Sequence, residues 1–113
     1  MDNNDNSYIV VLVTASSPDE AAGIAKKLVA DRLAACVNIL PSIRSIYRWQ
    51  GKICDDSEVL LVIKTQDRKL DRLMDRIKEI HSYDLPEMIV LPIIGGWEPY
   101  LAWLKKETAD DCL

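Results

Sequence analysis

The sequence has few of the side chains from which catalytic and metal centres are usually built. Among its 113 residues there are one histidine and three cysteines, and no two cysteines form a CxxC pair that would indicate a zinc or redox site. No serine or cysteine motif for nucleophilic catalysis accompanies the histidine. We therefore expect a protein that is not an enzyme.

Positive charge and long apolar runs are also scarce. Lys and Arg number 14 against 18 Asp and Glu, for a net charge of -4, so we expect no broad attraction to nucleic acid or anionic lipid. The longest apolar runs, 9–13 and 88–94, are far too short to cross a bilayer. The polar N-terminal segment lacks the basic-then-apolar order of a secretory signal. These features predict a cytoplasmic protein with neither a nucleic-acid partner nor a membrane span.

The cysteines are odd in number and far apart in the sequence, at Cys36, Cys54 and Cys112. Free cysteine is among the most frequently buried residue types. We expect reduced thiols, with Cys36 and Cys54 as small buried apolar side chains.

The length and composition predict a single domain. The sequence is 49% hydrophobic and 28% charged, with only 4 Gly and 5 Pro, which is typical of one globular core of this size. We place that domain over residues 8–107 and expect flexible termini at 1–7 and 108–113.

The first half of the chain predicts a strand, a helix and a long hairpin. The β-branched run 8–13 is typical of a central strand. Ser17, Pro18 and Glu20 then form the start signal of a capping box, for a helix that reaches about Leu33.

Residues 35–49 and 52–65 read as two extended strands joined by a turn at Gln50-Gly51. Pro41 marks a bend or bulge in the first of them, and Ile43, Ser45, Tyr47 and Trp49 share one face by the two-residue period. Both strands are about twice the usual length of five or six residues. We expect their ends to project beyond the helix layer and to need cover.

The second half predicts a helix, a strand and a short final helix. Leu70, Leu73 and Ile77 belong to an apolar stripe that ends near His81, and a strand follows at 88–94. The polar side of this same helix, opposite the stripe, is expected to face solvent and contains Asp67, Arg68, Lys69, Asp71, Arg72, Asp75 and Lys78.

The order βαββαβ with an added C-terminal helix predicts an α+β, ferredoxin-like sandwich with two helices on one face of a four-stranded antiparallel sheet. The uncovered face of such a sheet is normally polar. Here many of its residues are apolar, so we expect self-association to bury it.

Several segments resemble one family when taken in order. They are Thr14-Ala15, Leu33-Ala34-Ala35-Cys36-Val37-Asn38, Tyr47-Arg48-Trp49-Gln50-Gly51-Lys52-Ile53, Glu58-Val59, Lys64-Thr65 and His81-Ser82-Tyr83-Asp84-Leu85-Pro86-Glu87. Over residues 8–106 the chain is similar to CutA proteins. The resemblance implies divalent-cation tolerance, copper binding and a homotrimer that is related in fold to PII signalling proteins, with hairpins packed across subunits.

The resemblance also implies where copper would bind. Its ligands in the family are a cysteine on the first strand and adjacent histidines at the end of the second helix. The matching positions here are Val13 and the pair Ile80-His81, which leaves His81 as the candidate ligand for copper or another divalent cation. In a trimer, Glu87 of a second chain could join it. The ordinary alternative is a histidine near a helix C-terminus, where the helix dipole favours positive charge.

Two further functions stay open. A PII-like cleft between subunits could bind a small anion or metabolite near Tyr83, Glu87, Lys64 and Trp49, or the trimer could be a scaffold for a protein partner. Tyr47 and Trp49 suit a subunit interface. Glu58 and Lys64 lie on the sheet face opposite Val59, where a charged side chain needs either solvent or a partner.

Overall fold

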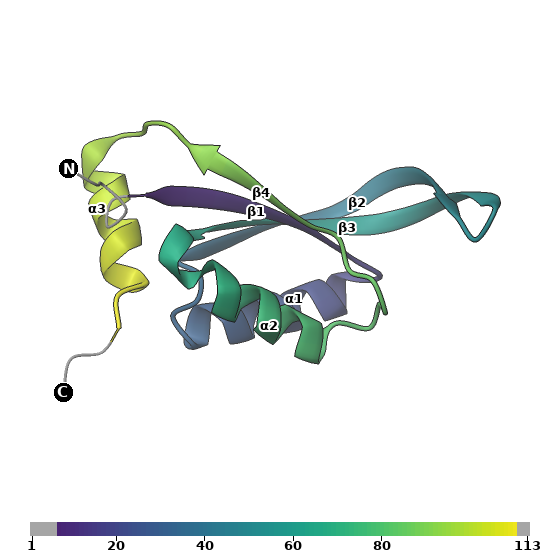
Figure 1. Ribbon diagram of the computed structural model, residues 1–113, viewed down its shortest axis with the longest axis horizontal. Helices are drawn as coiled ribbons and strands as arrows, with labels where there is room; N and C mark the ends of the chain where they lie inside the picture. The colour runs from purple at the N-terminus through teal and green to yellow at the C-terminus, as the bar shows by residue number, and fades with distance from the viewer. Residues whose placement is uncertain (1–6, 111–113) are drawn as a thin grey trace.

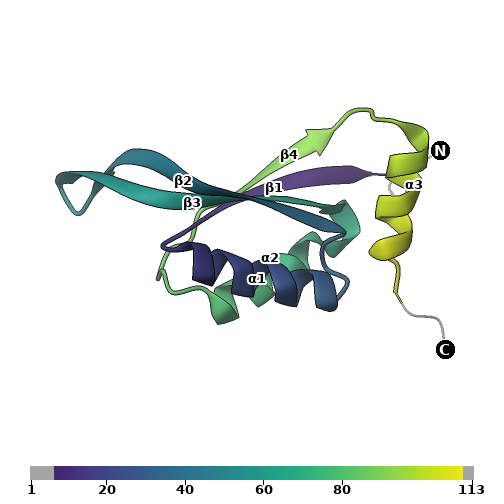
Figure 2. The same ribbon diagram turned by 180° about the vertical axis from the view of Figure 1, so that it is seen from behind.

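The computed structural model describes residues 7–110 as a four-stranded antiparallel sheet with helices. The strand order is β2-β3-β1-β4, and helices α1 and α2 cover one face (Figures 1 and 2). The elements are β1 (Tyr8–Ala15), α1 (Pro18–Ala30), β2 (Cys36–Trp49), β3 (Lys52–Gln66), the 3-10 helix η2 (Asp67–Lys69), α2 (Leu70–Ile80), β4 (Met88–Ile93) and α3 (Glu98–Glu107). The predicted ferredoxin-like sandwich is confirmed.

The core lies between the sheet and its two helices. Alternate residues of β1, such as Val11 and Val13, are fully buried and pack with the apolar stripe of α2, to which Leu73 and Ile77 belong. The two-residue period of the strands and the helical period of α2 therefore bring their apolar sides into one layer. Among the described residues no helix is long and apolar enough to cross a membrane.

Helix α1 begins as predicted and ends earlier than predicted. The Ser17 hydroxyl accepts the N–H of Glu20 at 3.1 Å, and Pro18 occupies the first turn. The helix ends at Ala30 and not near Leu33, because Arg32 takes a left-handed conformation with φ 59°. The N–H of Leu33 then returns to the carbonyl of Leu28 at 2.9 Å, which closes the helix end.

The long hairpin is confirmed, with strands of 14 and 15 residues. The register shifts between Leu40 and Ile43, at the bulge expected around Pro41. At the turn both Gln50 (φ 51°) and Gly51 (φ 78°) are left-handed, which matches the twist of the two strands. The outer half of the hairpin extends well past α1 and α2 (Figure 1).

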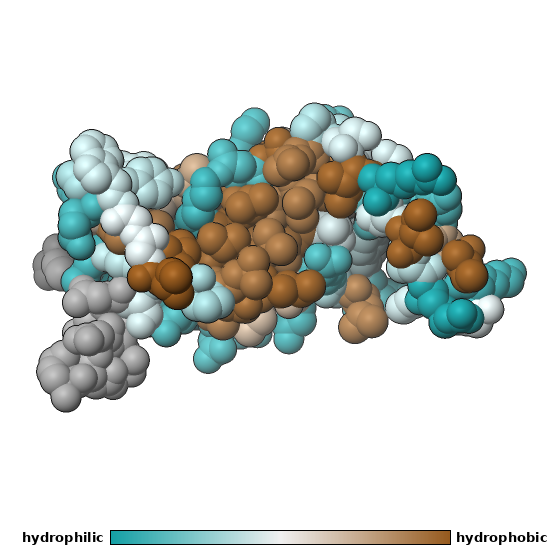
Figure 3. Space-filling view, turned by 90° about the horizontal axis from the view of Figure 1, so that it is seen from above, coloured by the Kyte–Doolittle hydropathy of each residue, from teal (hydrophilic) through white to brown (hydrophobic). Residues whose placement is uncertain are grey.

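The face of the sheet away from the helices is strongly apolar. Paired residues of neighbouring strands lie on the same face of the sheet. The residues on this face therefore follow from the pairings of β1 with β3 and β4, and of β2 with β3. We call this surface the open face; its apolar residues include Val10, Leu12, Leu40, Leu60, Val62, Ile89, Leu91 and Ile93. Figure 3 shows it as a broad hydrophobic area across the middle of the molecule.

Helix α3 is fixed beside the sheet end that lies farthest from the hairpin turn (Figure 2). The Arg32 guanidinium donates to the carbonyl of Glu107 at 3.3 Å, and the Gln66 amide donates to the hydroxyl of buried Thr108 at 2.8 Å. Of the termini predicted to be flexible, 1–6 and 111–113 lie outside the described residues. Thr108 and Asp110 are held by side-chain contacts.

Two burial predictions need correction. Lys69 was expected to face solvent with its neighbours on α2, yet it is only 1% exposed, because the end of the chain after α3 covers it with Asp110. Cys36 and Cys54 were expected to be buried, but both are partly exposed free thiols, because they lie toward the sheet edge and in the projecting hairpin. Cys112 lies outside the described residues.

Candidate functional site

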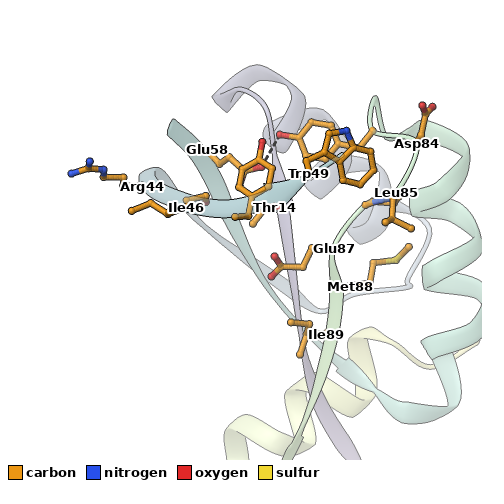
Figure 4. A pocket seen from close by; sticks show the side chains of 14 residues that line it. Thr14, Arg44, Ile46, Trp49, Glu58, Asp84, Leu85, Glu87, Met88 and Ile89 are labelled. Atoms are coloured by element: carbon orange, nitrogen blue, oxygen red, sulfur yellow. Dashed lines mark hydrogen bonds between the residues drawn. The ribbon is translucent and has the colours of Figure 1, made fainter. Parts of the chain in front are cut away.

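A cleft of about 900 Å³ lies where the outer hairpin meets the loop between α2 and β4. Its lining includes five of the six side chains predicted from the sequence as ligand or interface candidates (Figure 4). These are Tyr47, Trp49 and Glu58 from the hairpin, and Tyr83 and Glu87 from the loop and its end. These residues come from two segments that are far apart in the sequence, and the fold brings them together.

Tyr83 joins the loop to the hairpin. Its hydroxyl donates to the Glu58 carboxylate at 2.7 Å. Burial, and then the hydrogen bond to this carboxylate, raise the pKa of Tyr83 above its ordinary value. The phenol therefore stays protonated as a donor, which gives Glu58 the partner that its place on the open side of β3 requires.

Polar pairs also fix the outer part of the cleft. The Tyr47 hydroxyl donates to Asp56 at 2.6 Å, and this bond, followed by burial, raises the pKa of Tyr47 to about 12. Arg44 forms a bidentate ion pair with Asp55, in which Nε lies 2.9 Å from Oδ1 and Nη2 lies 2.7 Å from Oδ2. The Arg44 side chain extends away from the other lining residues (Figure 4). The two phenols of the cleft and the Glu58 carboxylate are thus already hydrogen bonded.

Lys64, the sixth candidate, lies elsewhere. It is on the open face near α3, where its ammonium donates to the Asn38 side chain and lies 4.0 Å from the Cys36 sulfur. It does not line the cleft. The two-residue period placed Lys64 on the correct face of β3, but six residues along the strand separate it from Glu58.

His81 has no exposed side-chain surface, and both of its ring nitrogens are occupied. Nε2 lies 2.7 Å from the carbonyl oxygen of Thr14, which can only accept, so Nε2 carries the proton. Nδ1 receives the backbone N–H of Tyr83 at 3.0 Å, so it is unprotonated. The neutral ring therefore ties the end of β1 to the loop that carries Tyr83.

Glu20 holds the neighbouring part of the same loop. Its carboxylate accepts the N–H of Ser82 at 2.7 Å and both the hydroxyl and the N–H of Ser16, at 2.8 and 3.1 Å. Burial alone would raise the pKa of Glu20, but the hydrogen bonds from Ser16 and Ser82 outweigh it and lower the pKa to about 2. The carboxylate is thus a charged junction between the start of α1 and the loop after α2.

These contacts bear on the copper site that the sequence implied. A metal ligand needs a free nitrogen lone pair, and both nitrogens of His81 are hydrogen bonded. Val13 is fully buried in the core and has no donor atom, and a second chain's Glu87 could not reach a histidine without exposed surface. Within residues 7–110, no group of three or more His, Cys, Asp or Glu is placed to hold a metal ion. Val13 and His81 therefore do not fit the copper site that the resemblance implies.

Sequence reasoning missed the role of Glu20. The spacing Ser17-Pro18-Asp19-Glu20 indicated a capping box, in which the glutamate returns to the N–H of the capping serine. The capping serine behaves as expected, but the glutamate bonds Ser16 and Ser82 instead. The sequence contains the signal of a capping box, whereas the hydrogen bond from the Ser82 N–H to Glu20 forms only in the tertiary fold.

Comparisons with known proteins place the chain among one family. Residues 9–107 match the family described as "CutA1 divalent ion tolerance protein". The "Divalent-cation tolerance protein CutA" of Thermus thermophilus is 50% identical over 99 residues, which cover 88% of this chain and 96% of the relative. The human "Protein CutA" is 45% identical over 102 residues, covering 90% of this chain and 57% of the relative. The chain therefore spans little more than half the length of that relative.

Solved structures agree with the sequence relatives. A divalent cation tolerance protein from Thermus thermophilus superposes with a TM-score of 0.88 at 48% identity, covering 90% of this chain and 99% of that one. CutA1 from Oryza sativa superposes with a TM-score of 0.91 at 44% identity, covering 96% of this chain and all of the other. The resemblance noted in the sequence is confirmed.

Replacing Glu20 tests the charged junction. We expect Glu20→Gln to lower the free energy of unfolding at pH 7 by about 2 kcal/mol, because a depressed carboxyl pKa stabilises the folded state. The pKa falls from 4.5 to about 2 on folding, so this stabilisation is present above pH 4.5 and is lost as the pH falls toward 2. Chemical unfolding across that range, at fixed protein concentration, measures it.

The matched control is Glu79→Gln, which removes an exposed carboxylate of α2 that pairs with Arg76 at the surface. It should change stability by less than about 0.5 kcal/mol. A pH-independent difference between Glu20→Gln and the parent protein, or an equal effect of both variants, would contradict the role given to Glu20.

A copper titration tests the role of His81. Glutamine can place an amide N–H near the position of Nε2, so His81→Gln should retain the bond to Thr14 while removing the imidazole. We expect calorimetric titration with Cu²⁺ to give the same stoichiometry and affinity for both proteins. Loss of a copper equivalent in a folded His81→Gln protein would show that the ring leaves its hydrogen bonds to bind metal.

Proposed function

Because the chain belongs to the CutA1 divalent ion tolerance family, we propose that it contributes to tolerance of divalent cations, copper included, as a non-catalytic homotrimer. Membership of the family is the reason for proposing divalent-cation tolerance, and the open face is the observation that supports the homotrimer. The absence of a catalytic role is supported by His81, whose two ring nitrogens are both engaged in fixing the fold.

The open face favours burial against further copies of the chain. Leu91 and Ile89 of β4 and Leu40 of β2 are each more than two-fifths exposed, and they lie on strands that form the two edges of the sheet. Exposed edges and contiguous apolar area both promote association. When the β4 edge of one chain contacts the β2 edge of the next, the chains form a closed ring if the rotation between neighbours is suitable. In a ring of three chains, the three open faces would be buried.

The hairpin supports the same assembly. Its outer half extends beyond the helix layer (Figure 2) and exposes Ile46, Trp49 and Ile53. Aromatic and apolar side chains on a projecting two-stranded ribbon gain stability only against another surface. In the proposed trimer each hairpin lies on a neighbouring chain and covers the mouth of the cleft.

The cleft is the second part of the proposal, as a small-molecule site that the neighbouring chain completes. Its two phenols and the Glu58 carboxylate are fixed before any ligand arrives, which lowers the cost of binding. Lys64 was the cation expected to hold an anion there, and it lies outside the cleft. Glu58 and Glu87 therefore favour a neutral or cationic ligand over an anionic metabolite.

A charge on the open face tests the trimer. We expect Leu91→Asp to convert a species of three times 12.8 kDa into monomer or aggregate, because a carboxylate cannot be buried there without a partner. Val29→Asp is the matched control, since Val29 on α1 is 43% exposed and Leu91 is 45% exposed. Native mass spectrometry of protein purified without chelator reports subunit number and any bound ion together. A monomeric parent protein would refute the proposal.

Growth under copper stress tests the tolerance role. In a host that lacks its own relative, the parent protein and His81→Gln should both restore growth at raised copper, because neither trimer nor cleft needs the imidazole as a metal ligand. Leu91→Asp should fail and Val29→Asp should succeed. If Leu91→Asp restores growth as a soluble monomer, tolerance does not depend on the assembly. If His81→Gln alone fails while folded and trimeric, and also loses a copper equivalent in the titration, the histidine serves the metal directly.

A further inference from the structure

A buried lysine lies at the end of the molecule that is far from the cleft. Lys69 is only 1% exposed, and its ammonium donates to Oδ1 of Asp110 at 2.5 Å. An ammonium group taken out of water requires an anion beside it. The anion here comes from the end of the described chain, three residues after the last residue of α3 (Glu98–Glu107).

Two arginines share that carboxylate. Arg72 Nη2 lies 3.2 Å from Oδ1, and Arg68 Nη1 lies 3.4 Å from Oδ2. The Arg68 guanidinium also donates to Gln66 at 3.4 Å, so buried Gln66 helps to orient it. We call Arg68, Lys69 and Arg72 the cation cluster.

The cation cluster carries more positive charge than Asp110 neutralises. Three cations surround one carboxylate, and within residues 7–110 neither Asp67 nor Asp71 forms an ion pair with any of them. The hydrogen bond from Lys69, and then that from Arg72, hold the pKa of Asp110 well below its usual range. A doubly charged anion with several acceptor oxygens would match this arrangement better than a single carboxylate, and arginine and lysine side chains recognise phosphate in this way.

We propose that Arg68, Lys69 and Arg72 form a binding site for a phosphate group, which Asp110 occupies in its absence. The carboxylate covers the site from the solvent side: the Asp110 side chain is 61% exposed, whereas that of Lys69 is 2% exposed. The end of the chain can therefore leave without opening the core. Phosphate binding releases Asp110 from η2 and α2, which makes this contact a switch at the end of the molecule opposite the hairpin turn (Figure 1).

A nuclear magnetic resonance titration with inorganic phosphate at constant ionic strength tests this site. In the parent protein, phosphate but not chloride should shift the backbone signals of Lys69 and Asp110 in a saturable way. Asp110→Asn should bind phosphate at least tenfold more tightly, because the amide does not compete for the cations. Asp75→Asn, which removes an exposed carboxylate from the same helix, should behave like the parent protein.

The same titration with a nucleoside monophosphate tells whether the phosphate group is recognised free or as part of a larger molecule. Shifts that are the same for phosphate and chloride in both the parent protein and Asp110→Asn would refute the site, as would equal affinities of Asp110→Asn and Asp75→Asn. If Asp110→Asn folds only when phosphate is present, phosphate is replacing the carboxylate and the proposal stands. If it folds in neither salt, the titration of the parent protein alone decides.

Discussion

Three parts of the described chain meet at the Glu20 carboxylate and the His81 ring, and the shape of the cleft depends on that meeting. A carboxylate with little exposed surface is stable only when several N–H or O–H groups donate to it. Ser16 and Ser82 supply them, while the histidine joins Thr14 to Tyr83. The loop after α2 is therefore anchored at the residues immediately before Tyr83, and this anchoring lets the Tyr83 hydroxyl reach Glu58 across the cleft.

The same contacts change the meaning of the one histidine in the chain. A residue type that suggests metal binding is here a neutral spacer between a carbonyl and an N–H, with its ring 4.7 Å from that of Tyr83. The valine at position 13 fits this view, because a side chain at this point of β1 faces the apolar core. Membership of a divalent-cation tolerance family thus does not require that this chain retain a copper site at His81.

Much of the fold followed from local patterns. The β-branched run of β1 indicates a central strand, the apolar stripe of α2 shows which side of the helix is buried, and the Gln50-Gly51 turn shows where the chain reverses. These features need no knowledge of distant residues. Lys64 and Lys69 show the limit. Periodicity put Lys64 on the correct face of β3 but did not show that it lies away from the cleft. It assigned Lys69 to the solvent side, where Asp110 arrives from the far end of the sequence and covers it. Glu20 was recognisable as part of a helix start, whereas its bond to Ser82 exists only in the folded chain.

The tautomer of His81 is the most direct test of this account. Nitrogen-15 magnetic resonance of the imidazole distinguishes a protonated from an unprotonated ring nitrogen and detects the hydrogen bond that each one makes. The geometry predicts a single tautomer, with the proton on Nε2 protected from exchange by the Thr14 carbonyl and Nδ1 unprotonated, and with no change when copper is added. Exchange between two tautomers, a proton on Nδ1, or loss of the ring signals on addition of copper would contradict it.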